Sequence, residues 1–417
     1  MAGRPTLRDA GSVRAGQRRW LWVVGPGLMV MLADTDAGSI VTAGQSGAVW
    51  GYRLLLLQVL LVPVLYLVME LTVRLGIVTG KGHAQLIREQ FGRGWAVVSV
   101  GTLVVAAVGA LVTEFAGIAG VAALFGIPAA AAVLPAAAFL VWLVLAGTYR
   151  RVELVGIALG LFELAFVAAA VLSHPHLPDL ARGFSPSQPL GQPGYLALVA
   201  ANIGAVVMPW MVFYQQGAVL DKGLGPRDLR AARINTAIGA VATQVVMASV
   251  LVATAVGLHG RTGSLRSVGD LAVALTPVIG SSAARIVLTA GILGASLVAA
   301  IVVSLALAWA VTEACAMPRS LDDPPRRAPV FYAIYVAAVV GGAALVLTSG
   351  SLVRLAVHVE ILNALLLPLV LGFLVLLAFR VLPRPYAPGL RERLALAGTA
   401  AAVIAIGLLS VGLSFGL

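Results

Sequence analysis

The sequence has little charge and almost no cysteine. Only 11% of its 417 residues are charged, whereas soluble domains carry about 25%, and this shortage excludes a soluble enzyme. The single cysteine, Cys315, excludes a disulfide within the chain and disfavours a thiolate metal cluster. No Walker-type phosphate-binding motif is present, so we expect no nucleotide partner. We also expect no enzymatic activity and no cofactor.

The chain is instead rich in apolar residues. They make up 60% of the chain, and the mean hydropathy is +1.00. A transmembrane helix needs about 20 predominantly apolar residues. Apolar runs bounded by charge, Gly or Pro predict an all-α polytopic membrane protein with eleven spans, near residues 21–48, 53–79, 95–125, 128–148, 152–173, 193–219, 231–258, 283–314, 329–349, 353–380 and 391–416.

The net charge of +11 has a topological explanation. With a cytoplasmic N-terminus, 22 of the 28 Lys and Arg residues fall in the basic N-terminal tail and the even-numbered connections. Cytoplasmic loops of membrane proteins collect such residues. We therefore expect a multi-pass protein of the cell membrane, embedded in the lipid bilayer, with a cytoplasmic N-terminus and no nucleic-acid partner.

Two of the predicted spans contain interruptions. Residues 33–42 read "ADTDAGSIVT", with Asp36 followed by Gly38 in the middle of span 1. Residues 206–213 read "VVMPWMVF", and Pro209 removes a backbone donor in the middle of span 6. Interruptions at matching places in two five-helix halves are typical of inverted-repeat transporters, where freed carbonyls face a cation. A bound cation would offset the cost of burying Asp36 in the membrane.

This pattern predicts five segments along the chain. They are a cytoplasmic tail (1–20), a first five-helix repeat (21–173), an extracellular connector (174–192), a second five-helix repeat (193–382) and an eleventh span (383–417).

Four stretches resemble one known family. "GPGLMVMLADTDAGSIVTAGQSGAVWGY" (25–52), "RLGIVTGKGHAQLI" (74–87), "EFAGIAGVAALFGIP" (114–128) and "GAVVMPWM" (204–211) are similar to the first, second, third and sixth spans of the Nramp family (natural resistance-associated macrophage proteins). The resemblance implies a LeuT-like inverted repeat of five plus five helices with an eleventh, in which spans 1 and 6 are broken. It also implies transport of divalent metal ions, so the metal is the substrate.

The resemblance places the metal ligands residue by residue. The side-chain ligands fall on Asp36, Ser39, Met208 and Glu360, and the carbonyl ligands fall on Ala33 and Ala205. Asp34 is an extra acid beside this set, expected to act directly or through a bridging water. Ser39 and Glu360 replace the family's Asn and Gln, and these changes favour hard ions such as Mg²⁺. Met208 is a soft ligand that favours Mn²⁺, Fe²⁺ or Cd²⁺.

The proton-coupling residues of the family are largely missing. Glu114 matches the family's third-span Glu, but Leu111, Trp210 and Gln215 stand at the positions of its Asp and two His residues. In this respect the chain resembles the Nramp-related magnesium transporters, which move Mg²⁺ and Mn²⁺ without protons. That branch usually lacks the methionine.

Two more acids lie inside spans. Glu70 and Glu163 are expected to form a substitute proton route, to line the vestibule, or to pair with Arg74 and Arg354, because buried carboxylates usually find a partner. His83 is expected to be solvated in a cytoplasmic loop.

The main interpretation is a secondary transporter of Mn²⁺ and/or Mg²⁺ that works by alternating access with weak or no proton coupling. One alternative is a proton-coupled Mn²⁺/Fe²⁺ symporter. Two others are a cation-coupled organic solute symporter and a metal sensor that no longer transports. Acids on spans 1 and 10 argue for a cation as the substrate.

Overall fold

The computed structural model describes residues 25–414 except 261–264, 266 and 349–351. Within these residues every regular element is a helix. The predicted tail (1–20) lies outside the described residues.

All eleven predicted spans coincide with helices, spans 1 and 6 as interrupted pairs, and their described ends agree with the prediction to within a few residues. They correspond to α2 (Pro26–Asp34) with α3 (Ala37–Trp50), α4 (Leu55–Thr79), α6 (Arg93–Ala123), α7 (Ala129–Leu145), α8 (Tyr149–Gly160) with η1 (Leu161–Glu163) and α9 (Leu164–Leu172), α11 (Pro193–Val206) with α12 (Pro209–Asp221), α13 (Leu229–Leu258), α15 (Ser281–Cys315), α16 (Pro329–Leu347), α17 (Leu352–Val381) and α18 (Leu390–Ser414).

Within the described part of the chain, eight helical stretches are long and apolar enough to cross a membrane. The broken pair α2 and α3 is not among them, whereas the broken pair α11 and α12 is counted as one stretch, Pro193–Asp221. The 17-residue α7 falls just below the length of a full span. The 25-residue α18 is not among the eight either, although it lies where an apolar run predicts a span.

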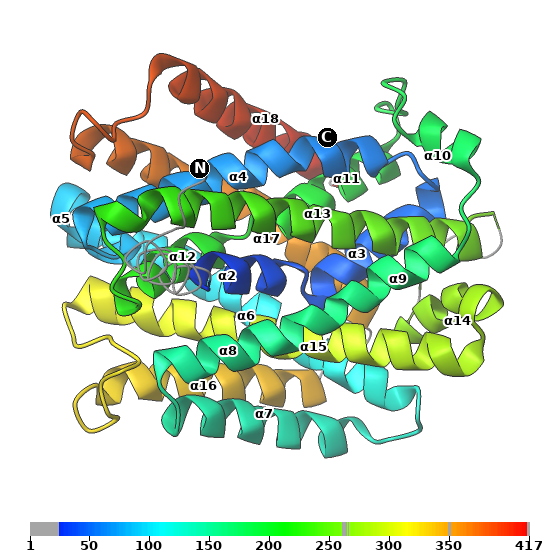
Figure 1. Ribbon diagram of the computed structural model, residues 1–417, viewed down its shortest axis with the longest axis horizontal. Coiled ribbons are helices and arrows are strands. Elements are labelled where there is room, and N and C mark those ends of the chain that lie inside the picture. Colours follow the sequence, from blue (N-terminus) through cyan, green and yellow to red (C-terminus); the bar gives the residue numbers. More distant parts are fainter. Residues whose placement is uncertain (1–24, 261–264, 266, 349–351, 415–417) are drawn as a thin grey trace, which may run out of the picture.

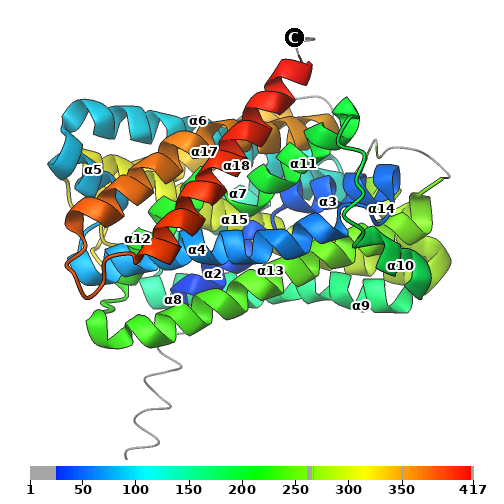
Figure 2. The ribbon, with the colours of Figure 1, turned by 90° about the horizontal axis from the view of Figure 1, so that it is seen from above.

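The long helices lie side by side, with their connections gathered at two ends (Figures 1 and 2). In Figure 1, α5 (His83–Phe91) and the connection from α15 to α16 lie at the left end, whereas α10 (Leu177–Gly183) and α14 (Val268–Ile279) lie at the right end. The left end carries the even-numbered connections that are rich in Lys and Arg. It is therefore the predicted cytoplasmic end.

The prediction for His83 is wrong. This residue begins α5 and is fully buried, with its ring edge-on to Phe213 at a centroid distance of 4.8 Å. Nδ1 of His83 lies 3.3 Å from Oε1 of Gln216, and Nε2 of Gln216 donates to the carbonyl of Lys81 at 2.8 Å. The amide oxygen of Gln216 therefore faces the ring, so Nδ1 donates. Burial lowers the pKa of His83 to about 4.

Small residues let helices approach closely around the two interrupted spans. A Cβ added at Gly204 would lie 1.8 Å from the backbone oxygen of Glu360, so α11 packs directly on α17. A Cβ added at Gly117 would lie 2.7 Å from Cβ of Ala37, so α6 packs on the start of α3. Close packing of this kind is how membrane helices associate without a hydrophobic driving force. It gathers α3, α6, α11 and α17 around one point.

Candidate metal-binding site between two broken helices

The first interruption lies at Thr35 and Asp36. The helix α2 ends at Asp34, and α3 begins at Ala37. Asp36 is the N-cap of α3: its backbone is extended, and its Oδ1 accepts a hydrogen bond from the backbone N–H of Ser39 at 2.7 Å. Gly38, which the sequence suggested as the breaking residue, lies in the first turn of α3. The capping carboxylate of Asp36, rather than the glycine, ends the irregular segment.

The second interruption follows from the missing N–H of Pro209. The helix α11 ends at Val206, and α12 begins at Pro209, with Met208 extended as its N-cap. In an unbroken helix residue 209 would donate to the carbonyl of Ala205, but proline cannot. That carbonyl instead accepts a hydrogen bond from the hydroxyl of Ser39 at 3.1 Å. The two interruptions therefore lie side by side.

A second carbonyl loses its helical partner on α2. In a continuous helix the N–H of Ala37 would donate to the carbonyl of Ala33. Here it donates to Oε2 of Glu114 at 3.2 Å. Glu114 thus helps to hold the break open, and it leaves the carbonyl of Ala33 without its usual donor.

Glu360 reaches the same point from α17. It is 1% exposed, and its Oε2 accepts a hydrogen bond from Nδ2 of Asn363 at 2.9 Å. A Cβ added at Gly38 would lie only 2.4 Å from Oε1 of Glu360. The role of Gly38 is therefore to let the carboxylate of Glu360 come against the first turn of α3.

Met208 is fully buried beside the second interruption. Its sulfur accepts a hydrogen bond from Nε1 of Trp210 at 3.2 Å. This contact fixes the thioether at the start of α12. Trp210, which stands where the family has a titratable histidine, here serves to orient Met208.

Several carboxylate oxygens at the breaks have no hydrogen-bond partner among the described residues. They are both oxygens of Asp34, Oδ2 of Asp36 and Oε1 of Glu360, all on side chains no more than 1% exposed. Translocon-based scales put the cost of one such acid at the bilayer centre at about 2.5–3.5 kcal/mol. Unpartnered oxygens of this kind are potential ligands for a cation.

Among the residues that the structure describes, no group of three or more His, Cys, Asp or Glu side chains is placed to hold a metal ion by itself. A site at the breaks would therefore need mixed donors. The two freed carbonyls, the Ser39 hydroxyl and the Met208 thioether are the donors available beside Asp36 and Glu360.

The other acids in spans fall into two groups. Glu70 hydrogen-bonds Arg74 on its own helix and lies 2.6 Å from Nε of Arg233, so it has the paired environment that was one of its predicted alternatives. Glu163 has no such partner. Its Oε2 contacts the hydroxyl of Thr35, and its Oε1 has no hydrogen-bond partner in the described part of the chain.

Sequence reasoning missed a buried ion pair beneath α2. Nζ of Lys222 lies 2.6 and 2.8 Å from the two carboxylate oxygens of Glu153, and both side chains are about 95% buried. A Cβ added at Gly25 would overlap this pair. The opposite charges at the ends of α8 and α12 were visible in the sequence, but nothing there showed that these two helix ends meet.

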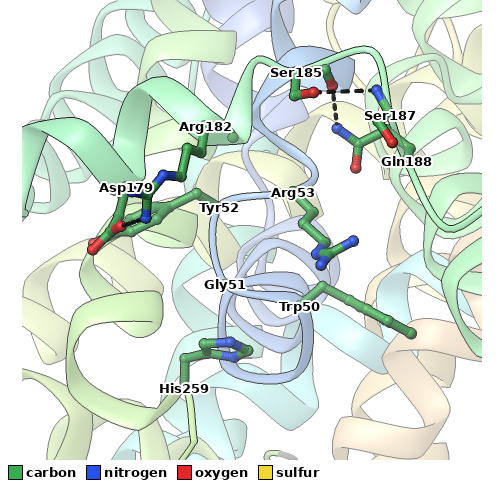
Figure 3. A pocket seen from close by; sticks show the side chains of 11 residues that line it. Trp50, Gly51, Tyr52, Arg53, Asp179, Arg182, Ser185, Ser187, Gln188 and His259 are labelled. Carbon is green, nitrogen blue, oxygen red and sulfur yellow. Dashed lines mark hydrogen bonds and ion pairs between the residues drawn. The ribbon is translucent and has the colours of Figure 1, made fainter.

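The pocket in Figure 3 lies at the other end of α3, away from the breaks. It is a cavity of about 530 Å³ between the α3–α4 turn, α10 and the end of α13. Arg53 and Arg182 line it, and Arg182 donates to Asp179 at 2.7 Å. The basic side chains make this pocket a poor site for a metal cation.

Similarity to known proteins identifies the family of this chain. The family model described as natural resistance-associated macrophage protein-like matches residues 27–413. The chain belongs to the Nramp family. This match includes both interruptions and all the ligand positions that the resemblance indicated.

Two Nramp relatives illustrate the degree of similarity. The divalent metal cation transporter MntH of Brucella suis is 29% identical over 285 residues, which cover 64% of this chain and 61% of that protein. MntH 1 of Pseudomonas aeruginosa is 31% identical over 284 residues, 64% of each chain. The chain therefore spans a little under two thirds of the length of these relatives.

Solved structures show the fold. A manganese transporter of Eremococcus coleocola matches with a TM-score of 0.77 at 20% identity, covering 95% of this chain and 87% of that one. MhsT in complex with L-phenylalanine matches with a TM-score of 0.59 at 15% identity, covering 94% and 98%. The predicted LeuT-like fold is confirmed.

Proposed function

We propose that this Nramp-family chain is a secondary transporter of divalent metal cations, Mn²⁺ and/or Mg²⁺, that works by alternating access. The observation that carries the proposal is the unpartnered Oδ2 of Asp36, fully buried between two helix interruptions. The names of the relatives, divalent metal cation transporter and manganese transporter, support it.

The ion would bind Asp36, Glu360, Ser39, Met208 and the carbonyls of Ala33 and Ala205. The two carboxylates supply the charge that balances a divalent ion, and Asp34 would act through a bridging water. Oxygen donors suit Mg²⁺ and Mn²⁺ alike, whereas the thioether favours Mn²⁺. Replacing Met208 by Ala should therefore lower Mn²⁺ uptake relative to Mg²⁺ uptake.

Alternating access would move the two broken spans against the rest of the bundle. The hydrogen bond from the Ser39 hydroxyl to the Ala205 carbonyl links the two interruptions, so displacement of a ligand on one broken span would also move a ligand on the other. The membrane potential can drive uptake: two charges moving through 100 mV release about 4.6 kcal/mol, at about 2.3 per charge. Proton coupling is therefore dispensable.

A proton-coupled symporter is the second candidate, and Glu114 is the observation that favours it. This acid is fully buried and accepts a hydrogen bond from the backbone N–H of Ala37, next to Asp36, so a proton on Glu114 would respond to metal binding. Leu111 and Trp210 cannot titrate, and Gln215 does not, which favours weak or absent coupling.

Uptake into proteoliposomes tests the proposal. Purified wild type and Asp36→Ala would be compared with Mn²⁺, Mg²⁺ and Ca²⁺ outside and a pH-sensitive dye inside. We expect Mn²⁺ or Mg²⁺ to enter wild-type vesicles without acidification, and Asp36→Ala to be inactive.

Entry of Mn²⁺ together with protons would instead establish the symporter. If neither ion moves through folded wild-type protein, the transport proposal fails, and the solute-symporter and sensor interpretations return.

A further inference from the structure

A second group of unpartnered acids lies beside the candidate site. Asp34, the last residue of α2, is fully buried, and neither of its carboxylate oxygens has a hydrogen-bond partner among the described residues. Asp36 is used as the N-cap of α3, but Asp34 caps nothing. The charged groups that act on it are Asp36 and Glu360, both acidic. The described residues therefore supply no cation that balances the charge of Asp34.

Glu163 reaches the next residue of the break, Thr35, from span 5. Its Oε2 contacts the hydroxyl of Thr35, which also donates to the carbonyl of Leu32 at 3.0 Å. Its Oε1 has no hydrogen-bond partner in the described structure. The charges that act on Glu163 are those of Asp36 and Asp34. Glu163 thus contacts Thr35, the residue that follows Asp34, and among the described residues the charges that act on the two carboxylates are all acidic.

Where span 5 passes the end of α2, its backbone packs closely on α2 and then changes from an α-helix to a 3₁₀ turn. A Cβ added at Gly160 would lie 2.6 Å from Cβ of Leu32, so span 5 packs directly on the last turn of α2. The next three residues, Leu161–Glu163, form a 3₁₀ turn between α8 and α9. A 3₁₀ stretch inside a longer helix often marks a functional hinge. Here it carries Glu163 toward Thr35.

The available donors are all oxygens. They are two carboxylates, the Thr35 hydroxyl and the carbonyls at the end of α2, where the helix dipole is negative. No sulfur or imidazole takes part, unlike at Met208. Such a set suits a hard cation.

We infer that Asp34, Glu163 and Thr35 form a second cation site, separate from the one at Asp36, for a hard cation of the Na⁺ or Mg²⁺ type. A cation here ties the end of α2 to the 3₁₀ turn of span 5. It also offsets the negative charge that remains beside the first site. This inference does not rest on transport, because a bound cation is detectable whether or not the chain moves it.

Equilibrium binding to purified protein in detergent tests the inference, with Na⁺ (as ²²Na⁺) and Mg²⁺ as separate probes. The Asp36→Ala background removes the first site. In that background we expect one saturable site per chain for at least one probe, lost in Asp36→Ala/Glu163→Gln. Saturation by Na⁺ identifies a monovalent site, and saturation by Mg²⁺ identifies a divalent one.

Glu70→Gln is the matched control, because Glu70 is also a buried acid inside a span but is paired with Arg74, away from the break. It should leave the second site intact. Thr35→Ser should retain it, whereas Thr35→Val should weaken binding at least threefold. These milder variants keep the test usable if a double variant fails to fold.

Two results would overturn the inference. One is a folded Asp36→Ala protein that binds neither probe. The other is unchanged binding in Asp36→Ala/Glu163→Gln, because a merely protonated Glu163 would be replaced by glutamine without loss. Failure of uptake in proteoliposomes would leave both binding results standing, so the two proposals fail separately.

Discussion

Buried acids at the predicted cytoplasmic end differ from those at the helix breaks. At the predicted cytoplasmic end three buried acids have a basic partner: Glu70 with Arg74, Glu153 with Lys222 and Glu313 with Arg319. At the breaks Asp34, Asp36 and Glu360 have only backbone, hydroxyl, amide or acidic neighbours among the described groups that act on them. The bundle therefore holds two kinds of carboxylate at similar burial.

The two kinds of carboxylate differ in what balances their charge, either a basic side chain of the protein or an ion or proton that binds and leaves. An arginine or lysine neutralises an acid permanently and ties two helices together, whereas breaking such a buried pair leaves an uncompensated charge. An acid without a built-in partner has its charge balanced only when an ion or a proton arrives. Substitutions of the first kind should change stability, and substitutions of the second kind should change ion binding.

The largest effect on ion uptake is expected at Gly38, which leaves room for the carboxylate of Glu360. Gly38→Ala places a Cβ where Oε1 of Glu360 now lies, so the carboxylate must move away. We expect the KM for Mn²⁺ uptake to rise about tenfold, the low end for disturbing a metal's surroundings. Gly101→Ala, where an added Cβ meets nothing within 4 Å, is the control.

The same position allows a test of mechanism. If Gly38→Ala acts through Glu360, the double variant Gly38→Ala/Glu360→Gln should be no worse than Glu360→Gln alone, because both changes remove one interaction. Additive losses in uptake would mean that Gly38 matters for the helix start and not for the ligand.

Glu70→Gln should lower stability and leave ion uptake nearly unchanged, the opposite of Gly38→Ala. Removing one partner of a fully buried pair costs about 3–5 kcal/mol, but Arg233 is 39% exposed and Arg74 retains Glu392. We expect unfolding free energy in detergent to fall by about 2 kcal/mol after this discount, with KM for Mn²⁺ changed less than about twofold. A large change in KM at unchanged stability would assign Glu70 to the transport path.

The smallest effect concerns the pH dependence of stability. His83 has a pKa of about 4 when folded, against about 6.5 in an unfolded chain. Between these values only the unfolded chain binds the proton, so His83 makes stability fall as pH falls below 6.5, by about 1.4 kcal/mol per unit.

The measurement compares unfolding at pH 7 and pH 5.5 in wild type and His83→Gln. The variant should lose less stability on acidification, by about 1 kcal/mol. His176→Gln, at the exposed N-cap of α10, is the control. An identical pH dependence in wild type and His83→Gln would mean that His83 is not held neutral.

Much of this architecture could be predicted from the sequence. Apolar runs located the spans, because the bilayer sets their length, and Pro209 located the second break, because proline has no N–H to donate. The first break was placed near Gly38 and lies at Thr35 and Asp36. A carboxylate N-cap ends an irregular segment as a glycine does, and the sequence alone did not choose between them.

Contacts between distant spans could not be predicted. The burial of His83 against Phe213 depends on α5 folding back under α12. The Glu153–Lys222 pair and the approach of Glu163 to Thr35 depend on how span 5 crosses the broken helices. The pattern of charge and hydropathy along a single sequence does not indicate which distant helices cross or which of their side chains meet. The ligand assignments to Asp36, Met208 and Glu360 stay predictions until an ion is observed.

Stabilisation by Mn²⁺ tests the central claim most directly. A ligand at 100 times its Kd stabilises the folded state by about 2.7 kcal/mol. With saturating Mn²⁺, wild type and Glu70→Gln should both show a stabilisation of this size, and Asp36→Asn should lose most of it. Equal stabilisation of Asp36→Asn and wild type, or its loss in Glu70→Gln alone, would contradict the account.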